Sequence, residues 1–391
     1  MKAGALYIAI FMLALLTLPM VAMHWGPSDG VDTREAVVHT PVVPDMQPQP
    51  AEQYGEAELT LALEPEGSPG LADTPPATPA DSGDEEEITV SEAVPANTAH
   101  GVLSFRIYDQ TTGTVSEVGL RDYVRGAVAS EMPVTFHEEA LKAQAVAAHT
   151  YALRHHTLQQ ENPDPTLYGA DFAADPSQMK GYITEEKAKQ FYGETYGEVY
   201  WEKICSATDS VLSYILEYDG EPIVAAYHAM SAGRTEAADN VWNGGAGYLV
   251  PADSEGDYLA PDYEMVTTLS VEAVREAIAT AYPAAVLAGD PSGWFSDIAR
   301  SESGYITGVN VGGLELHGKD IRTLFDLRSH NMDIACTGTG FTFTVRGHGH
   351  GVGMSQYGAD FLARQGYSFD EILEHYYQGA SLRIVDFDAL A

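Results

Sequence analysis

Two hydrophobic patterns recur between residues 102 and 377, one typical of strands and one of helices. Segments of alternating or β-branched apolar residues between Gly, Asp and Asn turns predict strands: Val102–Tyr108, Val211–Tyr218, Pro222–Ala226, Tyr305–Val311 and Phe341–Val345. Between them, helical spacing of apolar residues predicts Leu120–Glu131, Thr135–Leu158, Glu185–Tyr196, Val271–Ala281, Tyr357–Gln365 and a short Phe369–Tyr377. Helices interspersed with strands in this way predict a mixed α+β fold.

The start of the chain has a different pattern, an uncharged apolar run from residue 3 to residue 23. About 20 apolar residues rising 1.5 Å each cross the roughly 30 Å hydrocarbon layer of a membrane. The run ends in Val21-Ala22-Met23, with Met where signal cleavage needs a small residue. We therefore expect residues 1–23 to be a retained transmembrane signal anchor, with a cleaved signal peptide as the alternative. Both alternatives place the rest of the chain outside the cytoplasm.

Residues 24–100 have the composition of a disordered spacer. They hold sixteen acidic residues against the single basic residue Arg34, about half of the 21 prolines, and few aromatic residues. Such a stretch cannot bury enough apolar area to offset its chain entropy. Proline and like charges extend it. We expect this linker to hold a single folded domain, residues 101–391, away from the membrane.

The charge and cysteine content of the whole chain excludes several classes of function. The chain carries 57 Asp and Glu against 20 Lys and Arg, a net charge of −37. Nucleic-acid binding needs a basic surface, and attraction to anionic lipid headgroups does too, so we expect neither. Two cysteines, Cys205 and Cys336, are too few for a disulfide framework or a Cys-rich zinc site. One bridge and two buried free thiols both remain open.

Glu131 interrupts the apolar stripe of the first predicted helix. Apolar positions fall at Leu120, Val124 and Ala127, and the next step along that face reaches Glu131. Pro133 then ends the helix. A buried carboxyl without a paired cation has a raised pKa, as a general acid near neutral pH requires. The alternative is a structural glutamate that caps the helix or pairs with Arg121 or Arg125.

Polar side chains in three later segments are further candidates. The alanine-rich second helix offers Lys142, Gln144, His149 and Tyr151. The segment from Tyr227 to Thr235 breaks into small residues after two predicted strands, as a functional loop does. From Gly347 to Gly353 every second residue is glycine, which indicates positive φ angles or close approach of a ligand.

Two chemistries stay open in these later segments. His348 and His350 point the same way if the glycine segment is extended, so a metal site is possible, although spacing shows no third ligand. A hydrolase that pairs Ser231 or Ser355 with His228 or His350 is also possible. The sequence contains neither the motif of a phosphate-binding loop nor that of a zinc-protease helix.

Read together, these segments resemble the stage II sporulation protein D family, which includes the amidase-enhancer proteins. The similarity lies in Tyr123 to Pro133, Glu139 to Ala148, Tyr227 to Thr235 and Gly349 to Ala359. The resemblance implies a peptidoglycan lytic transglycosylase without a cofactor, membrane-anchored at the septal wall of a sporulating cell. It would cut the MurNAc–GlcNAc bond to leave 1,6-anhydro-MurNAc ends during engulfment. Its implied partners are glycan strands, an amidase and a membrane scaffold protein.

The resemblance also implies roles for particular residues. Glu131, in Glu-Met-Pro, matches the family's catalytic glutamate and would act as the single general acid and base. Candidate substrate contacts are Lys142, Gln144, His149, Tyr151, His228, Ser231, His350, Ser355 and Gln356. His149 stands where the family usually has Arg, so that contact is in doubt or pH-sensitive. Some members carry zinc, but residues 168–182 lack Cys and His, so we expect none. The rival hypothesis is a non-catalytic, glycan-binding enhancer of an amidase.

Overall fold

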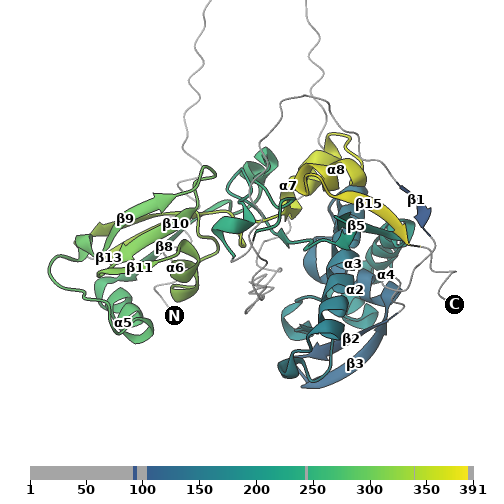
Figure 1. Ribbon diagram of the computed structural model, residues 1–391, viewed down its shortest axis with the longest axis horizontal. Helices are drawn as coiled ribbons and strands as arrows, with labels where there is room; N and C mark the ends of the chain where they lie inside the picture. The colour runs from purple at the N-terminus through teal and green to yellow at the C-terminus, as the bar shows by residue number, and fades with distance from the viewer. Residues whose placement is uncertain (1–90, 95–103, 243–244, 339, 386–391) are drawn as a thin grey trace, which may run out of the picture. The chain divides into compact units, whose positions relative to one another are not determined.

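The computed structural model describes residues 91–94, 104–242, 245–338 and 340–385, and it confirms a mixed α+β fold (Figure 1). The predicted anchor, residues 1–23, lies outside the described residues, as does most of the predicted linker. Four linker residues, Ser91–Val94, form β1 and pair in parallel with β15 (Ser381–Val385), so the stretch predicted as disordered contains one strand. Within the described ranges, we find no helix that combines the length and the apolar character needed to cross a membrane.

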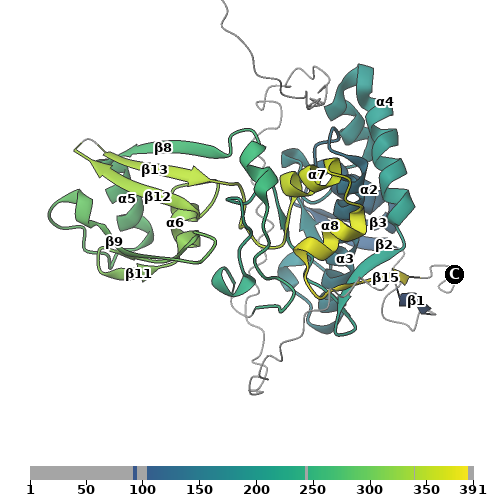
Figure 2. The same cartoon turned by 90° about the horizontal axis from the view of Figure 1, so that it is seen from above.

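The alanine-rich helix α3 (Glu138–Glu161) is the centre of the larger hydrophobic core. Alanines let other elements approach closely, and α3 contacts α2 (Leu120–Glu131), α4 (Glu185–Val211), α7 (Gln356–Arg364) and α8 (Phe369–Tyr376). Figures 1 and 2 both show α3 among these helices. The predicted helix Leu120–Glu131 has the bounds of α2, which ends there because Pro133 forces Met132, its C-cap, into an extended conformation.

Two helix boundaries differ from the prediction for local reasons. Helix α3 begins at Glu138 rather than Thr135, because His137 caps it by accepting a hydrogen bond from the Glu139 amide. Helix α4 continues to Val211 rather than ending at Tyr196. Gly193, at a φ of 81°, breaks the helical geometry for a single residue, after which the helix resumes. The predicted strand from Val211 is therefore shortened.

Five small sheets accompany the helices. Three pack with the larger core and have the orders β1-β15-β5-β6, β3-β2-β4 and β14-β7. Their remaining strands are β2 (Ser104–Asp109), β3 (Thr114–Gly119), β4 (Phe172–Ala174), β5 (Tyr214–Tyr218), β6 (Glu221–Pro222), β7 (Tyr227–His228) and β14 (Met354–Ser355). The predicted strand Pro222–Ala226 is thus reduced to its first residue, in β6. The short parallel pair β7 and β14 joins two of the segments that carry candidate residues.

Residues 264–346 form a second hydrophobic core of their own. Two antiparallel sheets, β11-β10-β9 and β12-β13-β8, surround Trp294 and Phe341, whose rings stack with centroids 5.6 Å apart. The elements are β8 (Glu264–Ser270), α5 (Val271–Ala281), β9 (Phe295–Arg300), β10 (Ile306–Val311), β11 (Leu314–Leu316), α6 (Gly318–Leu324), β12 (Met332–Thr337) and β13 (Gly340–Arg346). Cys336 packs against this core and Cys205 against the larger one. Both are free thiols and partly exposed rather than buried.

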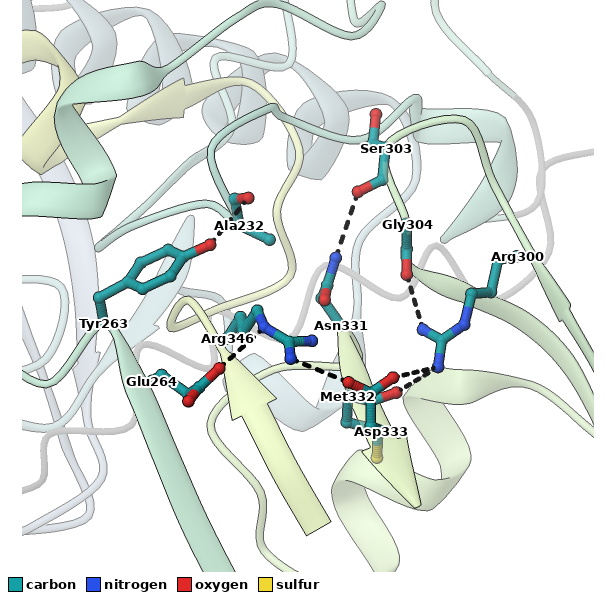
Figure 3. A network of polar contacts seen from close by, with 10 residues as sticks. All are labelled: Ala232, Tyr263, Glu264, Arg300, Ser303, Gly304, Asn331, Met332, Asp333 and Arg346. Carbon is teal, nitrogen blue, oxygen red and sulfur yellow. Dashed lines mark hydrogen bonds and ion pairs between the residues drawn. The ribbon is translucent and has the colours of Figure 1, made fainter. Parts of the chain in front are cut away.

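Ion pairs fix the strand register at one end of the sheet β12-β13-β8 (Figure 3). Arg346, directly opposite Glu264 in the register, pairs with it at 3.0 Å and with Asp333 at 2.9 Å. Arg300 reaches the same Asp333 at 3.0 Å. Single exposed pairs contribute at most about 1 kcal/mol, but here one carboxylate joins two guanidinium groups. Nearby, the Tyr263 hydroxyl donates to the Ala232 carbonyl and so links this region to the loop after β7.

Candidate active site

Glu131 lies at the last position of α2 and has two chemically different carboxylate oxygens. Its side chain is buried, with 6% of the residue exposed. Oε1 accepts a hydrogen bond of 2.9 Å from the Gly181 amide, whereas Oε2 is buried and has no partner among the described residues. Arg121 and Arg125 bind Asp209 of α4 instead, at 2.9 and 3.0 Å. The alternative interpretation of Glu131 as the partner of either arginine is therefore wrong.

Burial raises the pKa of Glu131 to about 7. The Gly181 amide and the positive charge of Lys180 act in the opposite direction, since both stabilise the ionised carboxylate. The raised pKa predicted for a buried carboxyl without a paired cation is confirmed. A carboxyl with this pKa exchanges protons readily at neutral pH, as general acid and base catalysis requires.

Three buried tyrosines from three different elements lie close enough to this carboxyl for its charge to act on them. Tyr123 comes from α2, Tyr151 from α3 and Tyr227 from β7, and all three are buried. Burial is the main cause that raises their pKa values, and the charge of Glu131 adds to it. Their hydroxyls therefore stay protonated and neutral. Tyr151 was predicted as a site residue; Tyr123 was missed, although its spacing of eight from Glu131 puts both on one helix face.

Lys142 and His149 make structural contacts elsewhere. The Lys142 ammonium group pairs with Glu139 at 2.8 Å and Glu138 at 3.0 Å on its own helix. His149 is buried and bonds to the backbone of Leu212 and Tyr214, where α4 passes into β5. Burial lowers its pKa to about 4, so the ring is neutral at physiological pH. The structure therefore shows His149 in contact with the protein backbone and not in a pH-sensitive substrate contact.

Two predicted glutamines do meet each other. The Gln356 amide nitrogen lies 3.4 Å from the Gln144 amide oxygen, so this contact joins the start of α7 to α3. Both residues are buried.

The glycine segment is bent rather than extended. Gly347, Gly349, Gly351 and Gly353 all have positive φ angles, between 71° and 110°, which confirms the conformational explanation for their spacing. The two histidines have different partners. One of them, His348, bonds to Arg328 at 3.0 Å. In the described ranges no three or more His, Cys, Asp or Glu residues are arranged to hold a metal ion.

His228 and His350 do come together. Their ring centroids lie 5.6 Å apart, and Trp242 flanks His350 with a centroid distance of 5.0 Å. His228 is fully buried, and its Nδ1 lies 3.1 Å from the Val352 carbonyl. Burial lowers the pKa of His228 to about 4, so its ring is neutral. His228 follows Tyr227 in β7, and successive side chains of a strand point to opposite faces, so the histidine pair lies on the other face of β7 from Tyr227.

Ser231 and Ser355 converge on a residue that sequence reasoning missed, Asp257. Each serine hydroxyl donates to one carboxylate oxygen of Asp257 at 2.6 Å, and all three side chains are buried. Burial raises the pKa of Asp257 to about 6. The serines thus hold the loop after β7 and the start of α7 together. Because both hydroxyl protons point to a carboxylate and not to an imidazole, the arrangement does not support a Ser/His hydrolase.

Replacing Ser355 with alanine is expected to lower the free energy of unfolding by about 2 kcal/mol. The change removes the cap that accepts from the Gly358 amide and one of the donors to buried Asp257. Urea unfolding measures this, with the exposed Ser210→Ala as control. An unchanged free energy of unfolding would contradict this structural role, and a loss of ester cleavage in Ser355→Ala would identify a nucleophile instead.

The fold and the site together define a class of protein. An α+β fold buries the Glu131 carboxyl, which is readily protonated, and its charge acts on three buried, neutral tyrosines. A carboxyl with such a pKa can both give and take a proton near neutral pH.

Comparison with known proteins places the chain in a family. The family model described as "Stage II sporulation protein" matches residues 108–218. Stage II sporulation protein D of Bacillus amyloliquefaciens is 33% identical over 285 residues, 73% of this chain and 80% of that protein. Its counterpart in Bacillus subtilis (strain 168) is 32% identical over 307 residues, 77% of this chain and 87% of that protein. The chain belongs to the stage II sporulation protein D family.

A more distant relative has a different name. The amidase enhancer of Bacillus subtilis (strain 168) is 26% identical over 187 residues, which are 48% of this chain and 21% of that protein.

Proposed function

We propose that this protein is a peptidoglycan lytic transglycosylase of sporulation, which cuts the MurNAc–GlcNAc bond and leaves 1,6-anhydro-MurNAc ends. The observation that carries the proposal is the Glu131 carboxyl. It is buried, it has a pKa of about 7, and one of its oxygens has no hydrogen-bond partner among the described residues. Family membership supports the same reading.

The reaction needs one residue that acts twice. Protonated Glu131 gives its proton to the glycosidic oxygen while the bond from that oxygen to C1 of MurNAc breaks, and an oxocarbenium-like sugar forms. The resulting Glu131 carboxylate then takes the proton of the C6 hydroxyl, whose oxygen bonds to C1 and closes the anhydro ring. The carboxyl ends protonated, ready for the next cycle. A pKa near 7 suits both steps, because neither the acid nor the base form is strongly disfavoured.

The surroundings of Glu131 favour this route over hydrolysis. Glycoside hydrolases use a second carboxylate, about 5 to 9.5 Å from the first, as nucleophile or as base for water. Among the described residues, Lys180 is the charged side chain whose field shifts the pKa of Glu131, and no carboxylate does so. An internal nucleophile, the substrate's own C6 hydroxyl, removes the need for a second acid.

The place of action and the partners are part of the same proposal. Residues 1–23 would anchor the chain in the cell membrane, and the acidic linker would carry the catalytic domain to the septal wall outside the cytoplasm. Glycan strands would be the substrate. An amidase and a membrane scaffold protein would be its partners, and the resemblance to an amidase enhancer supports the amidase.

Product analysis tests the reaction. Purified glycan strands are incubated with the full-length protein and their ends identified by mass spectrometry. We expect anhydro ends, which are one water lighter than reducing ends. Reducing ends would identify a hydrolase and contradict the proposal.

A second candidate is a non-catalytic enhancer of a wall amidase, and the amidase-enhancer relative is the observation that favours it. It predicts that glycan strands are bound but not cut. It also predicts that the protein raises the rate of a separately added amidase even when Glu131 is replaced. Cleavage without any amidase present would exclude it.

A further inference from the structure

The amide that holds Glu131 belongs to a tightly folded turn. Asp175 and Lys180 exchange two backbone hydrogen bonds of 3.0 Å, which close the turn around the 3-10 helix Pro176–Gln178. Past that helix, Met179 has a φ of 56° and Gly181 a φ of 76°. These two left-handed residues turn the Gly181 amide toward Oε1 of Glu131.

The side chain of Asp175 organises this turn. Its Oδ1 accepts from the Ser177 hydroxyl at 2.6 Å and from the Ser177 amide at 3.1 Å. The same oxygen accepts from the Gln178 amide at 3.3 Å and from the Thr111 hydroxyl at 3.0 Å. Thr111 lies in the connection between β2 and β3, so Asp175 ties the turn to a sheet as well as to itself.

We propose that Asp175 is a positioning residue for the general acid. By fixing the turn from Asp175 to Gly181, it keeps the Gly181 amide on Oε1 of Glu131 and leaves Oε2 as the oxygen that carries the proton to the glycosidic bond. An oxygen that accepts an amide N–H is the less basic of the two, so the proton resides on the other. This inference rests on the proposed function, because it presumes that Glu131 is the acid.

Loss of the turn would change the acid in two ways. The carboxyl would lose its orientation, which lowers the rate of proton transfer in the bound complex more than it affects binding. Its pKa would also rise above the value of about 7, since the Gly181 amide favours the ionised form. Lys180 is the charged group that faces the carboxyl, and Tyr123, Tyr151 and Tyr227 are the titratable ones.

The chain contains a matched control for this turn. Asp164 precedes a second 3-10 helix, Pro165–Leu167, and accepts from the amide and hydroxyl of Thr166, both at 2.7 Å. That turn also ends in a left-handed residue, Tyr168, at a φ of 54°. It bonds back to Gln159 of α3, so its loss should leave the Glu131 carboxyl undisturbed.

The experiment compares Asp175→Ala, Asp175→Asn and Asp164→Ala in the full-length protein. The rate of cleavage of glycan strands is followed from pH 5 to pH 9, and the Glu131 carboxyl is titrated by ¹³C NMR. Its signal is assigned by its loss in Glu131→Gln. For Asp175→Ala we expect kcat to fall about tenfold with KM within about twofold. Because cleavage begins with the protonated acid, activity is lost as pH rises through the pKa, and this alkaline limb should move to higher pH together with the NMR titration.

The controls separate positioning from general loosening. Asp175→Asn keeps an acceptor oxygen and should restore most of kcat, and Asp164→Ala should match the wild type. The proposal is overturned if Asp175→Ala leaves both kcat and the Glu131 titration unchanged, or if Asp164→Ala has the same effects. Full activity of Glu131→Gln would refute the proposed function instead. The NMR titration of Asp175→Ala would still report whether the turn controls this carboxyl.

Discussion

Glu131→Gln is expected to lower glycan cleavage about 1,000-fold or more, because an amide can neither give nor take the proton that the reaction transfers. Glutamine has nearly the same shape, and its side-chain oxygen still accepts from the Gly181 amide. The substrate should therefore still bind. The measurement is the yield of anhydro ends by mass spectrometry and glycan binding by sedimentation. The exposed Glu194→Gln serves as the control for an ordinary charge loss.

The same variant is expected to be more stable than the wild type above pH 7. The folded pKa of Glu131 is about 7 and the ordinary value is 4.5, so the unfolded chain releases this proton more readily than the folded one. Glu131 therefore weakens folding progressively as pH rises from about 4.5 to 7, by up to about 3 kcal/mol above that range. Glutamine does not ionise, so it adds no such pH-dependent cost to the free energy of folding. Urea unfolding at pH 8 should show a gain of about 1 to 3 kcal/mol, and at pH 4 the two proteins should be nearly equal.

These two readouts have separate meanings. Full cleavage activity in Glu131→Gln would contradict the catalytic assignment. No gain in stability at pH 8 would instead mean that the carboxyl is better solvated than the folded structure shows. A gain in stability combined with a loss of activity is the usual consequence of replacing a buried acid that destabilises the fold but serves the active site.

The first helix shows why some of the fold was predictable. Its apolar stripe and the proline that follows it are local signals, and the predicted bounds Leu120–Glu131 are the observed ones. Helix α4 has no such stop signal at Tyr196, and Gly193, which resembles a terminator, only bends it. Strands β8 and β12 were not predicted. Exposed positions occupy most of β8 and alternate along β12, and their pairing with β13 is a long-range contact that periodicity does not encode.

The same difference between local signals and long-range contacts separates the site residues that were predictable from those that were not. Glu131 was predictable because a carboxylate interrupts a local apolar stripe. The Gly181 amide and Asp257 were not, since a backbone donor has no side-chain signature and Asp257 meets its serines across 26 and 98 positions of sequence. Ser231 and Ser355 were predicted as substrate contacts from a motif, and the structure buries both against Asp257. A motif marks residues that belong together, while packing decides which of them remain accessible.

Gly353→Ala is expected to lower the free energy of unfolding by about 4 kcal/mol, because two costs of roughly 1 to 3 kcal/mol each add: a strained backbone and an overpacked contact. Gly353 has a φ of 71°, which L side chains rarely adopt, and an added Cβ would lie 2.0 Å from the Ala226 carbonyl oxygen. That oxygen already accepts from the Met354 amide at 3.0 Å and from the Tyr377 hydroxyl at 2.8 Å. Ala226 directly precedes β7, so any shift displaces Tyr227 beside Glu131.

Gly366→Ala isolates the first of these costs. Gly366 has a φ of 100°, and an added Cβ would meet nothing within 4 Å, so only the backbone penalty of about 1 to 3 kcal/mol applies. Urea unfolding of both variants at one pH gives the difference between them, which measures the collision with Ala226 alone. Since that collision moves β7, glycan cleavage per folded molecule should fall in Gly353→Ala and stay unchanged in Gly366→Ala. Equal unfolding free energies for the two variants would mean that β7 and β14 can shift without a measurable cost in stability. The glycine segment would then not set the position of Tyr227.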